Sequence, residues 1–316
     1  MQVISDYEKR NVPGPSAVAI GFFDGVHLGH QAVIRELVRL AGERHLTPCV
    51  LTFHVTPQTA PKPDFSFLTQ PEEQEALLAG LGVEVLYRPD FERLSGLSPA
   101  DTVTVLLAEK LKAALVTAGE DLRFGRGAAG DAALLRSLGG PLGIETVQVP
   151  VVPYDGRPVS STRIRQALRQ CMPERAAAML GRPFSFSASV TDGAHLGRSI
   201  GFPTINQPIP EGMTLPAFGV YYTAVQMNGL RFRGVTNVGI KPTVGGRIPL
   251  AETNLLDVSG DYYGRRARLE LLRFVRPEKK FGSLTELAAQ IQADRAGAEA
   301  WFAASDREKT EIAKKI

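Results

Sequence analysis

Short apolar runs alternate with amphipathic segments along the first part of the chain. The apolar runs are AVAIGFF (17–23), CVLTF (49–53), VEVLY (83–87), ALVTAG (114–119) and TVQVPVV (146–152), and each predicts a buried strand. Helical patterns follow them over residues 28–41, 69–79, 99–113, 131–138 and 161–170. Strands that alternate with helices predict an α/β fold whose parallel sheet is covered on both faces. Ligands of such sheets bind beyond the carboxyl ends of the strands.

Two helix starts in this region carry capping signals. Thr69 with Glu72 forms a capping box, so a helix is expected to begin after Thr69. Ser98 is followed by Pro99, which suits an N-cap and the first helical position.

The pattern changes to that of a β domain after LGRP (180–183). FSFSASV (184–190) alternates, and residues 219–239 predict two strands joined by a tight turn at Asn228-Gly229. ARLELLRFV (267–275) extends this pattern, with Arg266, Arg268 and Glu270 on one face and Ala267, Leu269 and Leu271 on the other.

Helical patterns return only near the end of the chain. Ser283 with Glu286 and Ser305 with Glu308 form two capping boxes there. We therefore expect an α/β domain over residues 1–182 and a small β-barrel with terminal helices over residues 183–316.

Composition places the chain among globular proteins. Of its 316 residues, 44% are hydrophobic and 22% are charged. The sequence contains neither an apolar signal region at its start nor a run of ~18 apolar residues, so no membrane segment is expected. Cys49 and Cys171 have no disulfide or metal-ligand spacing, which favours a reduced, cytoplasmic setting.

Charge is unevenly divided between the two predicted domains. Residues 1–182 carry 19 basic and 20 acidic residues, and residues 183–316 carry 17 and 13, giving −1 and +4. The total of +3 does not indicate a nucleic-acid partner. The basic second part is either a solvated strand face with a lysine-rich tail, or it turns some arginines toward a phosphate ligand; the candidates are Arg265, Arg266, Arg268, Arg273 and Arg276.

The segment GFFDGVHLGHQ (21–31) lies where the first predicted strand passes into a helix. Free backbone N–H groups and the helix dipole favour an anion at that point. His27 and His30 are three residues apart and can face one ligand, and imidazoles can donate hydrogen bonds to phosphoryl oxygens. The alternative is that the histidines only cap or pack locally. A two-metal site is less well supported because no further His or Cys cluster accompanies them.

A second segment of similar chemistry is VSSTRIRQAL (159–168). It places hydroxyl and guanidinium groups at another predicted helix start, where they suit a phosphate. Alone, it could equally be an ordinary serine N-cap before a basic helix.

Together the two segments resemble the signatures of the nucleotidyltransferase superfamily that includes the class I aminoacyl-tRNA synthetases. Further segments, in order, resemble the bacterial bifunctional riboflavin kinase/FAD synthetase family over nearly the whole chain. They are LTF (51–53), GEDLRFGRGAAGD (119–131), SSTRIR (160–165), LGRP (180–183), HLGRSIGFPTIN (195–206), GVYY (219–222), GVTNVGIKPTVGG (234–246), ETNLLD (252–257), GDYYG (260–264) and FGSLTELAAQIQAD (281–294).

The resemblance implies two activities on two domains. A Rossmann-like nucleotidyltransferase domain with an HxGH motif would adenylylate FMN to FAD and release pyrophosphate, and a C-terminal barrel would phosphorylate riboflavin to FMN. ATP is implied as co-substrate, ADP as a product and Mg²⁺ as cofactor. The implied partners are riboflavin, FMN, FAD and ATP/ADP, without nucleic acid or membrane, in a monomer or weak homo-oligomer.

The resemblance also implies roles for individual residues. His27 and His30 would act on the ATP phosphates, Thr204 and Asn206 would hold Mg²⁺, and Glu252 would be the base for the ribityl hydroxyl. ATP and flavin would be bound by Gly21, Phe22, Phe23, Asp24, Gly25, Gly29, Asp121, Arg123, Phe124, Ser161, Thr162, Arg165, Gly197, Arg198, Gly201 and Pro203.

Residue chemistry agrees with the kinase assignments but leaves alternatives open. Two neutral oxygen ligands beside phosphate and water suit Mg²⁺, and a carboxylate suits a base. Thr-Asn pairs are also common in turns, and a glutamate at a strand end is usually solvated.

The sequence departs from the family pattern at four places. Val55-Thr56-Pro57 replaces a usual Pro-His-Pro, and the displaced His54 is a candidate substitute for its histidine. Leu122 replaces a phenylalanine, Asn254 replaces a frequent histidine, and Ile205 replaces an alanine. The first two departures concern the expected adenylyltransferase.

Two other function classes stay open at this level. One is a flavin-sensing regulator that keeps the folds but binds RNA or protein, which a continuous basic and aromatic surface would favour. The other is an adenylyltransferase for a different small phosphate ester, with the barrel as a passive binding module.

Overall fold

The computed structural model describes residues 1–7, 12, 14–53, 65–192, 201–243, 246–256, 258 and 260–313, with the backbone alone described at 242–243, 246–247 and 308–313. The chain divides into two compact units. The first comprises residues 1–164 and 179–181, and the second comprises residues 165–178 and 182–316. Each unit has its own six-stranded sheet and its own apolar clusters.

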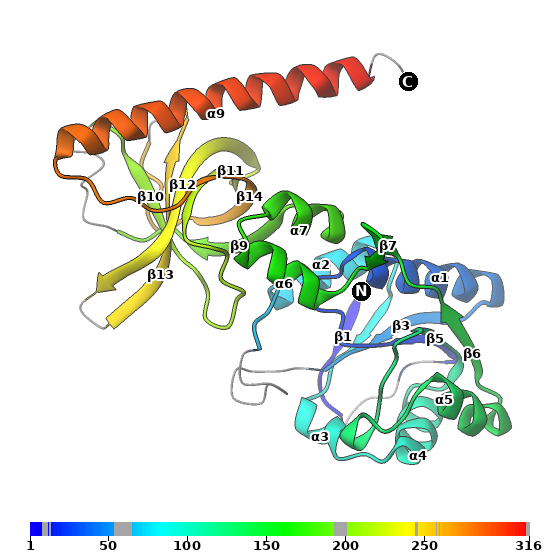
Figure 1. The fold of residues 1–316 in the computed structure, drawn as a ribbon. Coiled ribbons are helices and arrows are strands. Elements are labelled where there is room, and N and C mark those ends of the chain that lie inside the picture. The colour runs from blue at the N-terminus through cyan, green and yellow to red at the C-terminus, as the bar shows by residue number, and fades with distance from the viewer. Residues whose placement is uncertain are drawn as a thin grey trace. The chain divides into compact units, whose positions relative to one another are not determined.

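The first unit contains a parallel sheet with the strand order β1-β4-β3-β2-β5-β6 (Figure 1). All five predicted strands are present, and the predicted α/β class is confirmed. The short first strand was not predicted from the sequence. The strands are β1 Gln2–Ile4, β2 Ser16–Ile20, β3 Thr47–Leu51, β4 Val85–Tyr87, β5 Ala113–Gly119 and β6 Glu145–Val149.

Helices cover both faces of this sheet. In β2, Ala17 and Ala19 pack with the helix α1 (Leu28–Arg44), whereas Val18 points into the cluster on the opposite face. The helical segments of the unit are α1 Leu28–Arg44, α2 Pro71–Gly80, α3 Phe91–Ser95, α4 Pro99–Asp101, the π-helix η1 Thr102–Lys110, the 3₁₀ turns η2 Arg126–Ala128 and η3 Gly140–Leu142, and α5 Ala132–Gly139.

Of the two helix starts predicted from capping signals, the one at Ser98 is correct and the one at Thr69 is one residue early. Ser98 is the N-cap of α4 and its Oγ accepts a hydrogen bond from the Asp101 N–H at 3.0 Å, as predicted. The capping box at Thr69 is wrong as the N-cap, because α2 begins at Pro71 with Gln70 in the capping position. Proline is favoured at the first helical position, so it fixes this start one residue later.

Two helices and a small hairpin follow β6. The hairpin pairs β7 Pro153–Tyr154 with β8 Arg157–Pro158, and the helices are α6 Ser161–Arg169 and α7 Pro173–Leu180. Arg163 donates hydrogen bonds to the carbonyls of Pro158 at 2.6 Å and Tyr154 at 3.0 Å. The start of α6 is thereby attached to the hairpin before it.

The second unit contains an antiparallel sheet with the order β10-β13-β12-β11-β14-β9. The sheet curls, so its two edge strands approach each other, and the Thr191 N–H donates to the Asn206 carbonyl at 2.8 Å (Figure 1). The expected small barrel is thus a curled six-stranded half-barrel. Its strands are β9 Phe184–Ser189, β10 Thr204–Pro208, β11 Gly219–Met227, β12 Leu230–Thr243, β13 Gly246–Leu255 and β14 Arg266–Arg276.

The predicted hairpin turn at Asn228-Gly229 is confirmed. It joins β11 to β12, and both residues have positive φ angles, 53° and 76°. A tight turn of this kind requires such angles, which asparagine and glycine tolerate best.

A single helix, α9 Leu284–Ala313, ends the described chain. Its start is confirmed, because the Ser283 Oγ accepts a hydrogen bond from the Glu286 N–H at 3.2 Å. The second capping box, at Ser305, is wrong as a helix start, and the terminal helices expected there are one continuous helix. Ser305 lies inside α9 and its Oγ donates to the Trp301 carbonyl at 3.0 Å.

The two faces of the curled sheet are packed differently. Val220, Tyr222 and Val235 pack outward against Ala298 and Phe302 of α9. Inside the curl, the hydroxyl groups of Thr223, Thr236 and Thr253 form a fully buried series with O···O distances of 2.7 and 2.8 Å. The hydroxyls satisfy one another where water has no access.

Among the described residues, no helix has the length and apolarity needed to cross a membrane. Cys49 and Cys171 are both free thiols. Burial raises the pKa of Cys49 to about 12, so this thiol stays protonated and serves as a core residue.

Candidate active sites

His27 and His30 lie at the start of α1, beyond the carboxyl end of β2. His27 is the N-cap of the helix, and its Nδ1 accepts a hydrogen bond from the His30 N–H at 3.3 Å. Gly29 leaves room for this ring, since a Cβ at that position would lie 3.2 Å from the His27 Cε1. The capping alternative is therefore correct for the Nδ1 of His27. It does not account for the Nε2 of His27 or for the ring of His30.

The two imidazole rings are stacked, with centroids 3.5 Å apart and planes 18° from parallel. The Nδ1 of His30 is buried and has no hydrogen-bond partner among the described residues. Burial lowers the pKa of His30 well below its usual value, and the charge of His27 lowers it further. His30 is therefore neutral at neutral pH.

A cavity of about 320 Å³, the histidine cavity, opens beside this pair. It brings together residues that the sequence placed more than a hundred positions apart. Of the predicted site residues, Gly21, Phe22, Phe23, His27, Gly29, His30, Asp121, Arg123 and Ser161 line it. Leu122 lines it too, as does Ser160 of the predicted phosphate-binding segment 159–168. Val149, Val151 and Val152, which also line it, were not predicted.

Five predicted site residues of the first domain do not line this cavity: Asp24, Gly25, Phe124, Thr162 and Arg165. Asp24 is buried and its Oδ1 accepts a hydrogen bond from the Leu68 N–H at 2.9 Å. Its carbonyl accepts the Ser161 Oγ–H at 3.0 Å. Asp24 thus holds the turn before α1 against two other segments.

A second cavity of about 490 Å³, the aromatic cavity, has an apolar wall. The Phe22 and Phe53 rings stack at 5.1 Å between centroids, and Phe91 continues the row at 5.2 Å from Phe53. Phe124, a predicted site residue, also lines this cavity. A flat aromatic ligand could stack in it.

The two cavities are adjacent because four residues line both. These residues are Ile20, Gly21, Phe22 and Arg123. Arg123 is the charged member of this set, its side chain is 62% exposed, and it lies 3.5 Å from Asp131. An anionic group at the junction would therefore meet this guanidinium.

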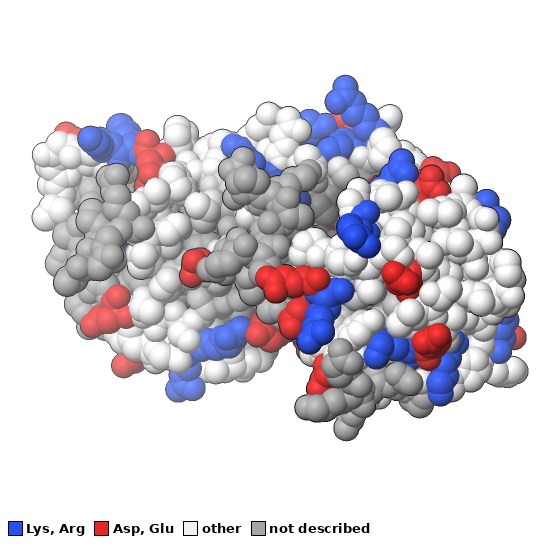
Figure 2. Space-filling model, turned by 90° about the horizontal axis from the view of Figure 1, so that it is seen from below, with Lys and Arg blue, Asp and Glu red and all other residues white. Residues whose placement is uncertain are grey.

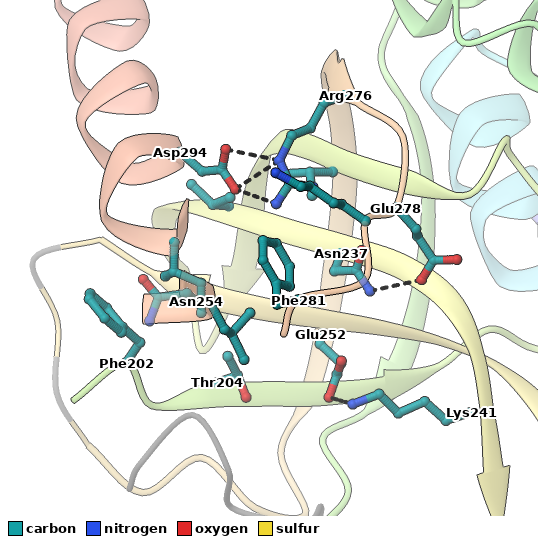
Figure 3. Close-up of a pocket in the computed structure, with 15 residues that line it drawn as sticks. Phe202, Thr204, Asn237, Lys241, Glu252, Asn254, Arg276, Glu278, Phe281 and Asp294 are labelled. Atoms are coloured by element: carbon teal, nitrogen blue, oxygen red, sulfur yellow. Dashed lines mark hydrogen bonds and ion pairs between the residues drawn. The ribbon is translucent and has the colours of Figure 1, made fainter. Parts of the chain in front are cut away.

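In the second unit, a cavity of about 270 Å³ lies between the outer face of the curled sheet and α9 (Figure 3). Thr204 and Glu252, both predicted, line this sheet–helix cavity. Strand register places Asn206 opposite Glu252, and Glu252 opposite Asn237 on the other side. Alternation along β10 puts Thr204 and Asn206 on one face.

Asn206 is nearly buried, at 6% exposed, and its Oδ1 has no hydrogen-bond partner among the described residues. An orphaned buried oxygen is costly unless something binds it. The described residues include no group of three or more His, Cys, Asp or Glu side chains that could hold a metal ion. The oxygens of Asn206 and Thr204 therefore suit a cation that takes its other ligands from elsewhere, as Mg²⁺ does with phosphates and water.

Glu252 forms an ion pair with Lys241, which also lines the cavity (Figure 3). Sequence reasoning missed Lys241. Lys241 lies on the same face of β12 as Asn237, and Asn237 pairs with Glu252 of β13. The sequence could have indicated the contact with Glu252 only if this strand register had been known.

Asn254, the departure from the family's frequent histidine, connects three segments. Its Nδ2 donates to the Pro203 carbonyl at 2.8 Å, directly before Thr204. Its Oδ1 accepts a hydrogen bond from Arg295 of α9. The side chain thus ties the predicted metal segment to the helix that covers it.

Of the five arginines considered as phosphate ligands, Arg276 alone lines the sheet–helix cavity in the described chain. Its guanidinium pairs with the buried Asp294 at 2.7 Å (Figure 3). Gln290 donates to the same carboxylate at 3.0 Å. Arg268 instead donates to the Ser185 Oγ. The solvated-face interpretation therefore fits Arg268 better than Arg276.

Some predictions fall outside the described residues. Gly197 and Arg198 belong to this group, as does His54. Gly201 and Pro203 are described and lie just before β10, and Gly201 has a positive φ of 86° that favours glycine.

Comparison with known proteins covers both units. The FAD synthetase family matches residues 9–163, and the riboflavin kinase family matches residues 180–302. A solved structure described as a macrolide-efflux protein from Streptococcus pneumoniae is similar at a TM-score of 0.86 and 31% identity, over 95% of this chain and 99% of that one.

Two curated relatives carry the same description, bifunctional riboflavin kinase/FMN adenylyltransferase. The protein of Escherichia coli K12 is 37% identical over 291 residues, which is 90% of this chain and 92% of the relative. The protein of Bacillus subtilis 168 is 34% identical over 295 residues, which is 91% of this chain and 92% of the relative. With both halves matched, the chain belongs to the family of bifunctional riboflavin kinases/FMN adenylyltransferases.

Proposed function

We propose that the two activities are divided between the two units of the chain. FMN adenylylation takes place in residues 1–182, at the histidine and aromatic cavities, and riboflavin phosphorylation takes place in residues 183–316, at the sheet–helix cavity. The observation that carries this proposal is the pair of separate polar sites, one with stacked histidines and one with a carboxylate beside an orphaned amide oxygen.

In the kinase step, Glu252 is the base that accepts the proton of the riboflavin hydroxyl as its oxygen attacks the γ-phosphorus of ATP. Thr204 and Asn206 are the residues that would hold Mg²⁺. When bound, this ion neutralises charge on the ATP phosphates. The orphaned Oδ1 of Asn206, opposite Glu252 in the sheet, supports that assignment.

In the adenylylation step, an oxygen of the FMN phosphate attacks the α-phosphorus of ATP and pyrophosphate leaves. The Nδ1 of His27 accepts the His30 N–H, so the proton of a neutral His27 ring lies on Nε2 and can be donated to a phosphoryl oxygen. His30 is neutral and stacked on His27, which keeps both rings in one orientation. Such preorganised donors stabilise charge that develops in the transition state.

The flavin of FMN would stack in the aromatic cavity against Phe22 and Phe124. Its phosphate would then lie at the junction with the histidine cavity, where Arg123 supplies a positive charge. Ser161, which lines the histidine cavity at the start of α6, would contact the ATP phosphates. The phosphate-binding roles of Thr162 and Arg165, which do not line this cavity, stay predictions.

The rival classes predict different surfaces and products. On the described part of the face in Figure 2, basic and acidic residues are interspersed and form no continuous basic patch. The described part of this face therefore offers no surface of the kind that an RNA-binding regulator would use.

One assay separates the bifunctional enzyme from both rivals. Purified chain is incubated with riboflavin, ATP and Mg²⁺, and the flavins are separated by chromatography. We expect FMN and FAD; unchanged riboflavin would indicate one of the two rivals, because neither of them phosphorylates riboflavin in its barrel. Glu252→Gln should lower FMN formation ~10²–10⁴-fold while FAD formation from supplied FMN survives, and equal loss of both would contradict two separate sites.

A further inference from the structure

Lys241 occupies an unusual position in the sheet–helix cavity. It lies on β12 opposite Ile248, and its side chain runs along the sheet to the Glu252 carboxylate on β13 (Figure 3). The lysine side chain is 45% exposed and the glutamate side chain 21% exposed. Ion pairs at this exposure contribute little to stability, so the contact has no evident structural purpose.

The other two carboxylates of the cavity already have partners. Glu278 accepts a hydrogen bond from Asn237 at 3.3 Å, and Asp294 is paired with Arg276. If Glu252 takes up a proton during phosphoryl transfer, it loses its charge. Lys241 then loses its anionic partner, because the other carboxylates in the described part of the cavity are already hydrogen-bonded or paired.

The transferred phosphoryl group supplies that missing anion. We propose that Lys241 is a catalytic residue of the kinase step, whose ammonium group passes from Glu252 to the phosphoryl group as it is transferred. The proposal rests on the role proposed for Glu252. Lysine binds phosphate well as a compact point charge on a flexible stem.

Distance and charge balance agree with this transfer. A base lies about 2.6–3.2 Å from the hydroxyl it deprotonates, and the attacking oxygen starts ~3–3.5 Å from phosphorus. A group in contact with Glu252 is thus one side-chain rotation from the phosphoryl oxygens. The bond from the riboflavin oxygen to the γ-phosphorus forms, the bond from that phosphorus to the ADP oxygen breaks, and the hydroxyl proton goes to Glu252.

The test compares Lys241→Gln and Lys241→Arg with a matched control, Lys280→Gln. Lys280 is exposed and does not line the cavity. Initial rates of riboflavin consumption are followed by chromatography, with and without added FMN, and a thermal melt checks folding. We expect Lys241→Gln to lower kcat ~10²-fold with little change in the KM for riboflavin, and to weaken inhibition by added FMN. Lys241→Arg should retain more activity, and Lys280→Gln should match the parent chain.

The outcomes distinguish this proposal from the one it rests on. A normal kcat in Lys241→Gln, with Glu252→Gln inactive, would overturn the role of Lys241 and leave the base assignment intact. A lowered kcat with unchanged FMN inhibition would mean that Lys241 only positions Glu252, which also overturns the proposal. An active Glu252→Gln chain would instead remove the proposed base.

Discussion

Gly130 faces the ring of Phe124 with no space for a side chain. A Cβ at this position would lie 2.7 Å from two ring carbons and 2.8 Å from a third. Carbon atoms in contact normally lie ~3.5–4.0 Å apart, so the ring in a Gly130→Ala chain must move by roughly 1 Å. The backbone of Gly130 is outside the left-handed region, and the effect is therefore purely steric.

Two quantities should change in Gly130→Ala. Overpacking costs ~1–3 kcal/mol, and at about 2–4 °C per kcal/mol for a unit of this size the Tm should fall by roughly 2–12 °C. Displacement of Phe124 removes a stacking contact worth ~0.5–1.5 kcal/mol, which corresponds to a rise of about 2–12-fold in the KM for FMN. Riboflavin phosphorylation should be unchanged, because the sheet–helix cavity belongs to the other unit.

The assay is FAD formation from FMN and ATP, with a thermal melt of the same preparations. Gly140→Ala is the matched control, because a Cβ there meets nothing within 4 Å and the backbone is helical. A Gly130→Ala chain with a lowered Tm but an unchanged KM for FMN would refute the placement of Phe124 against the flavin.

Three further predictions concern the proposed ligands. Thr204→Val and Asn206→Ala should each raise the Mg²⁺ and ATP concentrations needed for riboflavin phosphorylation; unchanged rates at low Mg²⁺ would make them turn residues. His27→Ala and His30→Ala should each lower kcat for FMN adenylylation ~10²–10³-fold. The loss in the double variant should be smaller than the two losses combined, because both rings act on one phosphoryl group. Normal FAD synthesis in the single variants would mean that the histidines only shape the turn. Because the folded pKa of His30 is lowered from 6.5, stability should fall as pH drops below that value, since the unfolded chain binds the extra proton. In thermal melts between pH 5 and 8, the Tm of His30→Gln should change less with pH than the Tm of the parent chain. An equal change of Tm with pH in both chains would mean that other groups cause it.

Local signals in the sequence were sufficient where a feature depends on neighbouring residues. Asn228-Gly229 specifies its turn by the φ angles these residues tolerate, and Ser98 caps its helix within three residues. The capping box at Ser305 failed for the opposite reason. Trp301 and Phe302, just before it, pack around Tyr222 of the sheet, and this contact favours continuing the helix.

The site could be predicted only in part, because its pairings depend on strand register. His27 and His30 are close in sequence, so one helix turn brings them together. Asn206 and Glu252 are 46 positions apart and become neighbours through pairing of β10 with β13. Lys241 reaches Glu252 only after β12 and β13 pair, and neither its type nor its spacing indicated this contact.

The link that Asn254 makes between α9 and the segment before Thr204 has a consequence for the order in which the cavities of the two units form during synthesis. Among the described residues, all those that line the histidine and aromatic cavities precede Thr162 in the chain. The sheet–helix cavity needs Asp294 and, through Asn254, Arg295, both on the final helix of the second unit. Domains fold from the N-terminus as the chain leaves the ribosome. The nascent protein should therefore acquire the site that consumes FMN before it acquires the site that makes it.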